Sequence, residues 1–227
     1  YPFDADADSN GDILVSQFNR GGVKKFVYDS AALDTSFGKK GTSGKGNVTH
    51  EGSNKCKTSF SYSGEVYNDV FYTTAYYEKS VVAINASNGQ CIRKYDLGFY
   101  PYGMTIDQDT GYLYVGGNNG FKTLNLSNHS IQNCSLNNNF KFNYGSTVSG
   151  GYLYFYRSPR IYRSMLNTSG SRCPQDSTSK FNFNVISLII LHRGNKASNM
   201  CILSITKSNK SIYFSNCYNI TKNLFWF

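Results

Sequence analysis

The stretch Gly111-Tyr112-Leu113-Tyr114-Val115 returns forty residues later as Gly151-Tyr152-Leu153-Tyr154-Phe155. Each copy follows a short polar turn and has the composition of a β-strand. Related stretches begin near residues 12, 69 and 211, so the copies are about 57, 43, 40 and 59 residues apart. A period near forty built from short strands predicts an array of similar β units, in which the long spacings hold insertions or one degenerate unit.

Further strands are expected around each copy. A third strand is predicted at 22–28, 80–84, 121–126 and 161–166, and a fourth at 90–95 and 131–136. Four strands per unit is the anatomy of a β-propeller blade. No stretch has a helical apolar stripe, and 19 Tyr and 16 Phe suit pleated surfaces. We therefore predict an all-β fold in one domain, residues 1–227: a β-propeller of about five four-stranded blades, or six if one is degenerate.

The last predicted blade is incomplete. Leu203 to Ile205 aligns with a first strand and Cys217 to Phe227 with a third, which leaves the outer strand missing. Three interpretations remain: the ring closes imperfectly, the chain is part of a longer polypeptide, or another molecule supplies the missing edge. We expect the last, self-association through the incomplete blade, because an uncovered apolar edge strand promotes association.

Two segments carry a resemblance to a known repeat. Asp8 to Val15, followed by Gly22 to Phe26, resembles the repeat of NHL and YVTN-type β-propellers, and Gly111 to Leu126 is similar to it. In those families a turn, a GxIYV strand and an xVxxF strand recur in each blade. The resemblance implies the architecture alone, since these families include binding modules, lyases, surface-layer proteins and lactonase-like hydrolases.

The cysteines favour an oxidising compartment. They are even in number, widely spread, and have neither CxxC nor zinc-ligand spacing. Three disulfides are the simplest interpretation, and six buried thiols in a cytosolic propeller are the alternative. Six cysteines allow fifteen pairings; sequential pairing, beginning with Cys56 to Cys91, is one hypothesis, and disulfides between neighbouring blades would staple the ring. The six are Cys56, Cys91, Cys134, Cys173, Cys201 and Cys217.

Eight Asn-x-Ser/Thr sequons point to the same compartment. An asparagine-rich chain produces some sequons by chance, but most of these fall in predicted turns or just after a strand, where glycans could be carried. We expect a secreted glycoprotein at an extracellular or cell-surface location. The sequon residues are Asn47, Asn85, Asn125, Asn128, Asn133, Asn167, Asn209 and Asn219.

The acidic segment at the start of the chain suggests a cation site. Asp6, Asp8 and Asn10, followed by Gly11, match the beginning of a calcium loop. The twelfth position is Gln17, where such a loop has a bidentate Glu, and no helices flank it. A solvated Asx/Gly hairpin turn explains the same residues. We expect no other cofactor.

Charge gives a weaker indication of partners. The net charge is +9, and four of the 14 acidic residues lie within the first twelve positions. A basic, Tyr-rich surface could hold acidic polysaccharide, with aromatic rings against sugar rings; ordinary solvated lysines are the alternative. No nucleic-acid-binding signature is present, so nucleic acid is not expected. The longest apolar run, Val185 to Leu191, is too short to span a membrane.

The residues do not favour an enzyme. Only His50, His129 and His192 are near-neutral acid/base groups, and no GxSxG, HExxH or phosphate-loop motif is present. We therefore predict a non-catalytic binding or structural module of an extracellular or surface assembly. The alternative is a calcium-dependent, lactonase-like hydrolase that uses the central channel, for which Asp107 and Asn143 are the candidate positions.

Overall fold

Every regular element that the structure describes is a β-strand. The computed structural model of the chain describes residues 2–17, 22–38, 56, 58, 60–134, 145–157, 160–168, 172–181, 192–194, 197–205 and 212–220. Over these residues eighteen strands form five antiparallel sheets, and none of the segments is a long apolar helix able to cross a membrane.

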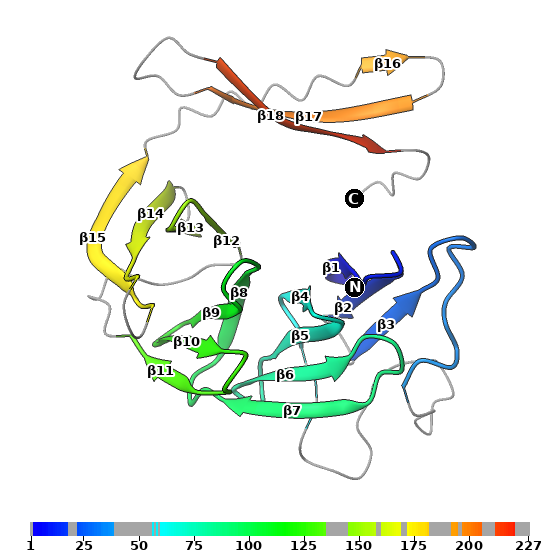
Figure 1. Cartoon of the computed structure of the whole chain (residues 1–227), viewed down its shortest axis with the longest axis horizontal. Coiled ribbons are helices and arrows are strands. Elements are labelled where there is room, and N and C mark those ends of the chain that lie inside the picture. Colours follow the sequence, from blue (N-terminus) through cyan, green and yellow to red (C-terminus); the bar gives the residue numbers. More distant parts are fainter. Residues whose placement is uncertain are drawn as a thin grey trace. The chain divides into compact units, whose positions relative to one another are not determined.

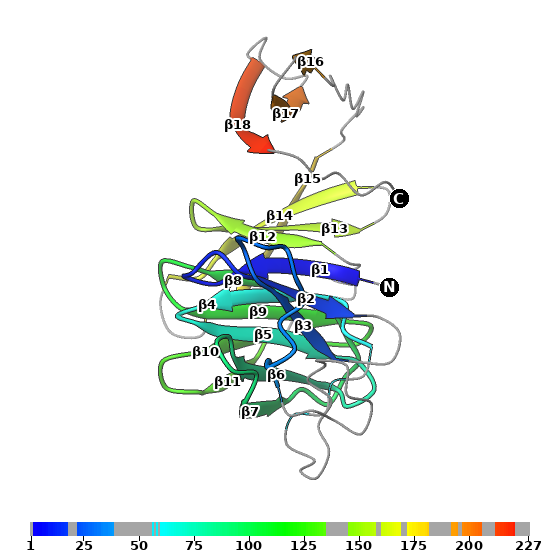
Figure 2. The same cartoon turned by 90° about the vertical axis from the view of Figure 1, so that its right-hand side faces the viewer.

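The chain divides into two compact units, Tyr1–Lys180 and Phe181–Phe227. Unit 1 holds four sheets, which follow one another in chain order and run outward from their first strands (Figures 1 and 2). Their strands are β1 (Pro2–Ala7), β2 (Ile13–Gln17) and β3 (Val23–Phe26); β4 (Gly64–Tyr67), β5 (Val70–Ala75), β6 (Ser80–Asn85) and β7 (Cys91–Asp96); β8 (Pro101–Asp107), β9 (Tyr112–Gly117), β10 (Phe121–Asn125) and β11 (Ile131–Asn133); and β12 (Ser146–Ser149), β13 (Tyr152–Arg157), β14 (Arg160–Leu166) and β15 (Pro174–Phe181).

The repeated Gly-Tyr-Leu-Tyr phrase marks the turn into the second strand of a sheet. Gly111 and Gly151 have φ of 67° and 77°, a left-handed conformation that glycine adopts without steric cost. The carbonyl of Gly111 accepts a hydrogen bond from Leu126 N, and that of Gly151 from Leu166 N, each at 2.9 Å. The phrase therefore recurs because each sheet needs the same turn.

Three apolar cores fill the spaces between the four sheets of unit 1. Leu14, Phe71 and Ile84 pack between the first two sheets, and Leu113 belongs to the core between the second and third. Phe155 lies in the core between the third and fourth. Strand β6 is buried on both faces, which explains its continuous run Val-Val-Ala-Ile.

The last sheet differs in detail from the prediction. It consists of β16 (His192–Gly194), β17 (Ala197–Ile205) and β18 (Ile212–Ile220), in that order. Leu203 to Ile205 is therefore in the central strand, and Cys217 continues β18 instead of beginning a third strand. Both strands are nine residues long, because their pairing continues beyond the apolar ends that the sequence pattern marks. Residues 221–227 lie outside the described part.

Candidate functional site

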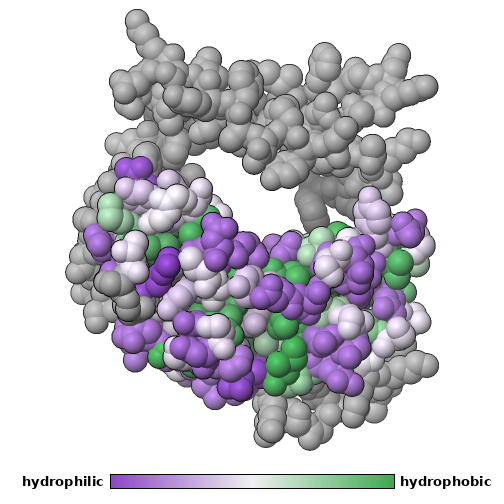
Figure 3. Space-filling model, in the orientation of Figure 1, coloured by the Kyte–Doolittle hydropathy of each residue, from purple (hydrophilic) through white to green (hydrophobic). Residues whose placement is uncertain are grey.

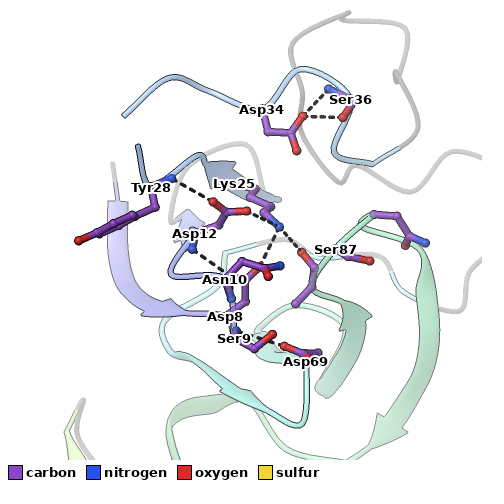
Figure 4. Close-up of polar contacts among 12 residues, drawn as sticks. Asp8, Ser9, Asn10, Asp12, Lys25, Tyr28, Asp34, Ser36, Asp69 and Ser87 are labelled. Atoms are coloured by element: carbon purple, nitrogen blue, oxygen red, sulfur yellow. Dashed lines mark hydrogen bonds and ion pairs between the residues drawn. The ribbon is translucent and has the colours of Figure 1, made fainter. Parts of the chain in front are cut away.

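The predicted calcium loop forms the β1–β2 turn, and a lysine lies between its carboxylates. Lys25 Nζ is 2.8 Å from Asp8 Oδ2 and 2.9 Å from Asp12 Oδ2 (Figure 4). Asp8 Oδ1 accepts the backbone N–H groups of Asn10 and Asp12, each at 3.0 Å. The turn itself is thus an Asx/Gly hairpin, as in the alternative interpretation: Ser9 and Asn10 at its tip are exposed, whereas Asp8 and Lys25 are buried.

The positive charge of Lys25 and the negative charges of Asp8 and Asp12 attract one another. Burial disfavours a charged Lys25, but hydrogen bonds and ion pairs to the two aspartates raise its pKa above the ordinary value. A hydrogen bond from Tyr28 N, followed by the contact with Lys25, lowers the pKa of Asp12. Among the described residues no cluster of three His, Cys, Asp or Glu side chains could hold a metal ion. Asp6 Oδ2 and Asp8 Oδ2 have separate partners, Val66 N and Lys25 Nζ, and calcium binding by Asp6, Asp8 and Asn10 stays a prediction.

Asp6 belongs instead to a row of carboxylates on the innermost strands. Asp4 Oδ2 accepts hydrogen bonds from Gly64 N and Ser63 Oγ, and Asp6 Oδ2 accepts one from Val66 N at 2.7 Å. One sheet further, Glu65 Oε2 accepts the N–H of Ile106 at 2.8 Å. Each carboxylate therefore ties its strand to the first strand of the next sheet.

Burial changes the acidity of this row. Desolvation raises the pKa of Glu65 to about 7, against the hydrogen bond from Ile106 and with the help of the nearby charges of Asp4 and Asp6. Desolvation also raises the pKa of Asp4. Perturbed acids can mark functional sites, but structural networks perturb them equally, and here each oxygen has a backbone or hydroxyl donor.

A partly exposed aromatic surface lies at the other end of the strands from the β1–β2 turn. Its core is Tyr62, Tyr76 and Tyr102, whose ring centroids are mutually 5.3 to 5.4 Å apart. Four further rings contact this core directly or through each other, and none of the seven is buried. The seven residues, called the aromatic surface below, are Phe3, Phe60, Tyr62, Tyr76, Tyr77, Tyr100 and Tyr102.

The sequence prediction noted a Tyr-rich composition but missed the residues of this surface. A sequence signal does exist: an aromatic-x-aromatic pattern precedes or opens the first strand of successive sheets. It is present as Phe60-Ser-Tyr62 and Tyr100-Pro-Tyr102, and also as 1–3 and 142–144. Residues 1 and 142–144 lie outside the described part.

Two of the sequential cysteine pairs form disulfides, Cys56–Cys91 and Cys134–Cys173. Cys134 follows outer strand β11 and Cys173 precedes outer strand β15, so this disulfide joins neighbouring sheets. Cys56 lies in the connection from the first sheet, and Cys91 begins β7 of the second. Cys201 is opposite Cys217 in the β17–β18 register, and their side chains lie outside the described part.

Four of the described sequon residues, Asn85, Asn125, Asn128 and Asn167, lie in turns or directly beside a strand end. Asn85 and Asn125 end β6 and β10, and the Oδ1 atom of each accepts hydrogen bonds from the Ser two positions later. Asn128 and Asn133 are exposed, and Asn167 is half-buried. Asn219 is in β18, with its side chain outside the described part, and Asn47 and Asn209 are not described.

Two of the residues considered for catalysis, Asp107 and His129, are described, and each contacts a different partner. Asp107 closes β8 in the turn to β9, and its Oδ2 is 3.8 Å from Arg172 Nη1. His129 is an exposed turn residue, and its Nδ1 is 2.9 Å from Tyr95 Oη. Asn143, His50 and the side chain of His192 lie outside the described part.

Comparisons of sequence find no relative: no family model matches the chain, and neither does any curated protein. Solved structures do match. Hydrazine synthase of Kuenenia stuttgartiensis aligns with a TM-score of 0.56 and 12% identity, over 98% of this chain and 63% of that one. Virginiamycin B lyase of Staphylococcus aureus aligns with a TM-score of 0.55 and 18% identity, over 94% of this chain and 69% of the lyase. A chain of a nidogen/laminin complex aligns with a TM-score of 0.50 and 9% identity, over 72% of this chain and 75% of that one.

These similarities concern the fold. The neighbours are β-propellers, so the chain is an all-β protein of propeller type, as the forty-residue repeat predicts. Its similarity to NHL and YVTN-type repeats holds at the level of architecture. The neighbours include an enzyme and proteins that are not enzymes, and at these identities none transfers an activity.

Proposed function

We propose that this chain is a secreted, N-glycosylated and disulfide-stabilised β-propeller that acts as a non-catalytic binding module of an extracellular or cell-surface assembly. The observation that carries the proposal is the pair of disulfides, Cys56–Cys91 and Cys134–Cys173, at places where one sheet of unit 1 meets the next. Disulfides persist in oxidising compartments and are rare in the cytosol. Here they reinforce a fold whose sheets otherwise meet through apolar packing and through hydrogen bonds from side chains to the neighbouring backbone.

The sequons support this compartment. Asn85, Asn125 and Asn128 lie at the ends of β6 and β10 that are remote from the aromatic surface, since the opposite end of β6 adjoins Tyr77 and Lys79. Glycans at these turns would shield one end of the sheets and leave the aromatic end accessible. This arrangement suits a glycoprotein that binds a partner through one face.

The hydrolase alternative would need carboxylates that converge on a cation and substrate. Asp4, Asp6 and Glu65 instead accept hydrogen bonds from the neighbouring strand, and Asp8 pairs with Lys25. These contacts support a structural role for the acidic residues. Calcium-stimulated hydrolysis of a lactone or phosphoester panel, abolished by Asp4→Asn, would contradict the non-catalytic proposal.

Intact-mass measurement tests the compartment. The protein is produced by a secreting eukaryotic host and weighed under non-reducing conditions before and after enzymatic deglycosylation. We expect a loss of mass on deglycosylation, and alkylation of cysteines only after reduction. Asn128→Gln removes one sequon, and Asn10→Gln is the matched control outside any sequon. Cysteines that alkylate without reduction, in a protein without glycans, would contradict the proposal.

Self-association is the second part of the proposal. In the described part of unit 2, β18 pairs with β17 on one side and is the edge of a three-stranded sheet. An edge strand of nine residues offers unpaired backbone groups to another chain. Sedimentation velocity should show a dimer or larger species that Ile212→Lys dissociates; a monomer throughout the micromolar range would exclude this assembly.

A further inference from the structure

We propose that the aromatic surface binds an anionic polysaccharide, with its tyrosine rings against the sugar rings and Lys79 facing a carboxylate or sulfate group. The inference deepens the binding role proposed above and rests on it. The proposed saccharide site contains neither a cysteine nor a sequon asparagine, so this inference and the proposed function can fail separately.

Three successive sheets build this surface. Phe3 comes from β1, Tyr76 and Tyr77 from the β5–β6 turn, and Tyr102 from β8. Phe60, Tyr62 and Tyr100 come from the segments that lead into first strands. The aromatic-x-aromatic pattern brings rings from three sheets into one cluster around Tyr62, Tyr76 and Tyr102. A cluster that spans three sheets offers several neighbouring rings to successive sugar units of one ligand.

The rings lie outside the core. The side chains at the ends of the underlying strands, such as Ala75 and Ser80, are fully buried, whereas Phe3 is 44% exposed and Tyr77 58%. The other five rings are half-buried, so the cluster is partly accessible to solvent. Contiguous accessible apolar groups on a soluble protein mark a binding surface more often than isolated ones do. The face of unit 1 seen in Figure 3 is mainly hydrophilic, with smaller hydrophobic areas between the polar residues.

The chemistry of the surface fits a sugar. Five of the seven residues are tyrosines, each with a flat apolar ring and a hydroxyl that can donate or accept. A pyranose ring has the complementary form, an apolar face of C–H groups edged by hydroxyls. The hydroxyls of Tyr76 and Tyr102 are 3.4 Å apart, so two polar groups lie together among the rings. A purely apolar partner would exclude water from these two hydroxyls and offer them no hydrogen bond in its place.

Lys79 gives the surface its preference for negative charge. Its Nζ is 4.7 Å from the centroid of the Tyr100 ring, and among the described residues it has no ion-pair partner. A cation held over a ring face keeps its N–H groups available for an acceptor. Glu78 is the acidic neighbour in the same turn, while the whole chain carries a net charge of +9. Long-range attraction therefore also favours an anionic polymer.

The test is calorimetric titration of the secreted, glycosylated full chain with three hexasaccharides. They are a hyaluronan hexamer, which carries carboxylates, a heparin hexamer, which carries sulfates, and neutral cellohexaose. We expect at least one anionic hexamer to bind and cellohexaose to bind at least tenfold more weakly. The two anionic probes distinguish carboxylate from sulfate as the recognised group.

Four variants locate the site. Tyr77→Ala should weaken binding of the anionic hexamer about fivefold, through the loss of one ring contact. Lys79→Ala should weaken it similarly and reduce its salt dependence, while Lys79→Arg should retain both. Tyr28→Ala is the matched control, because Tyr28 is 70% exposed and lies against Gly11 at the opposite end of the sheets. Thermal unfolding checks that each variant folds.

The proposal is overturned if none of the hexamers binds at millimolar concentration, if cellohexaose binds as well as the anionic probes, or if Tyr28→Ala weakens binding as much as Tyr77→Ala. If the protein still carries glycans and intact disulfides by mass, such a result overturns the saccharide inference alone. Unpaired cysteines in a protein that carries no glycans would overturn the function proposed above, whatever the result of the titration.

Discussion

Lys25 shows how a single buried residue holds an acidic turn together. Its ammonium forms ion pairs with both Asp8 and Asp12 and also donates to the carbonyl of Ala86, which follows β6 of the second sheet. A sequence pattern of alternating acids resembles a cation loop, and in this protein the cation is the side chain of a lysine thirteen residues after Asp12.

Replacement of Lys25 should be strongly destabilising. Lys25→Met leaves the buried carboxylate of Asp8 without its counter-charge, and we expect a loss of about 3 to 5 kcal/mol in the free energy of unfolding. Urea denaturation measures it. Lys24→Met, one position earlier and half-buried, is the control and should change stability by less than about 1 kcal/mol. Equal effects of the two variants would contradict the assigned role.

Glu65 should make stability depend on pH. Its pKa is about 7 in the folded protein and near 4.5 when unfolded, so between these values only the folded state holds the proton. The free energy of unfolding should therefore fall as the pH rises from 4.5 to 7. Above pH 7 the stabilising contribution of protonated Glu65 is lost. Glu65→Gln should flatten that decrease and be the more stable form at pH 8. Parallel profiles for both proteins from pH 4.5 to 8 would refute this.

At the scale of elements, each sheet is joined to the next by a different means. The first strands are linked by the carboxylates of Asp4, Asp6 and Glu65, the interiors by apolar cores, and the outer edges by disulfides. The first strands have backbone N–H groups without a partner strand, and the carboxylates accept hydrogen bonds from these groups. The outer edges have few neighbouring side chains to pack against, and the disulfides hold them.

The Cys134–Cys173 disulfide should contribute substantially to stability. It closes a loop with a sequence separation of 39 residues. By loop entropy its removal in the double variant Cys134→Ala/Cys173→Ala should lower the free energy of unfolding by about 4 kcal/mol. Urea denaturation under non-reducing conditions measures the change. Gln132→Ala, an exposed residue of β11, should have no effect. Unchanged stability of the double variant would show that the outer edges are held by packing alone.

Gly117 allows β9 to approach the connection that enters β8. A Cβ atom at this position would meet the carbonyl oxygen of Tyr100 and the ring of Phe99. Gly117→Ala should therefore cost about 1 to 3 kcal/mol and disturb the aromatic surface at Tyr100. Gly145→Ala is the control, because nothing lies within 4 Å of its Cβ position. Thermal unfolding compares the two, and equal melting temperatures would contradict the expected clash.

At the scale of the whole molecule, the two ends of the sheets in unit 1 differ chemically. One end carries exposed rings and Lys79, and the other carries the sequons of β6 and β10. Strand β6 separates Lys79 from Asn85 by six residues, or about 20 Å. The consecutive antiparallel strands create this difference, since alternate turns fall at opposite ends.

Glycans at Asn85 and Asn128 should therefore leave saccharide binding unaffected. We expect the wild-type protein and the Asn85→Gln/Asn128→Gln variant to bind the anionic hexamer with the same Kd, within about twofold, in calorimetric titrations. Tyr77→Ala serves as the reference for a change that does reach the surface. A tenfold difference between the two proteins would place these sequon turns and the binding surface on the same side.

The repeat of short alternating segments predicted most of the strands, but not β15 or β16. Second strands expected near residues 12, 69, 112 and 152 are β2, β5, β9 and β13, because alternation and turn residues act over a few positions. Sequential pairing of Cys56 with Cys91 and of Cys134 with Cys173 is likewise confirmed. The boundaries of the last sheet were wrong, because β17 and β18 pair beyond their apolar ends.

The sequence by itself determined the β architecture, the four-stranded period and the turns at Gly111 and Gly151, all of which depend on local steric and hydrophobic preferences. Only the tertiary structure decided that Lys25 neutralises Asp8 and that Phe3, Tyr62 and Tyr102 form one partly exposed surface. These contacts join residues far apart in the chain, and their energies depend on burial and on neighbours that only the assembled sheets create.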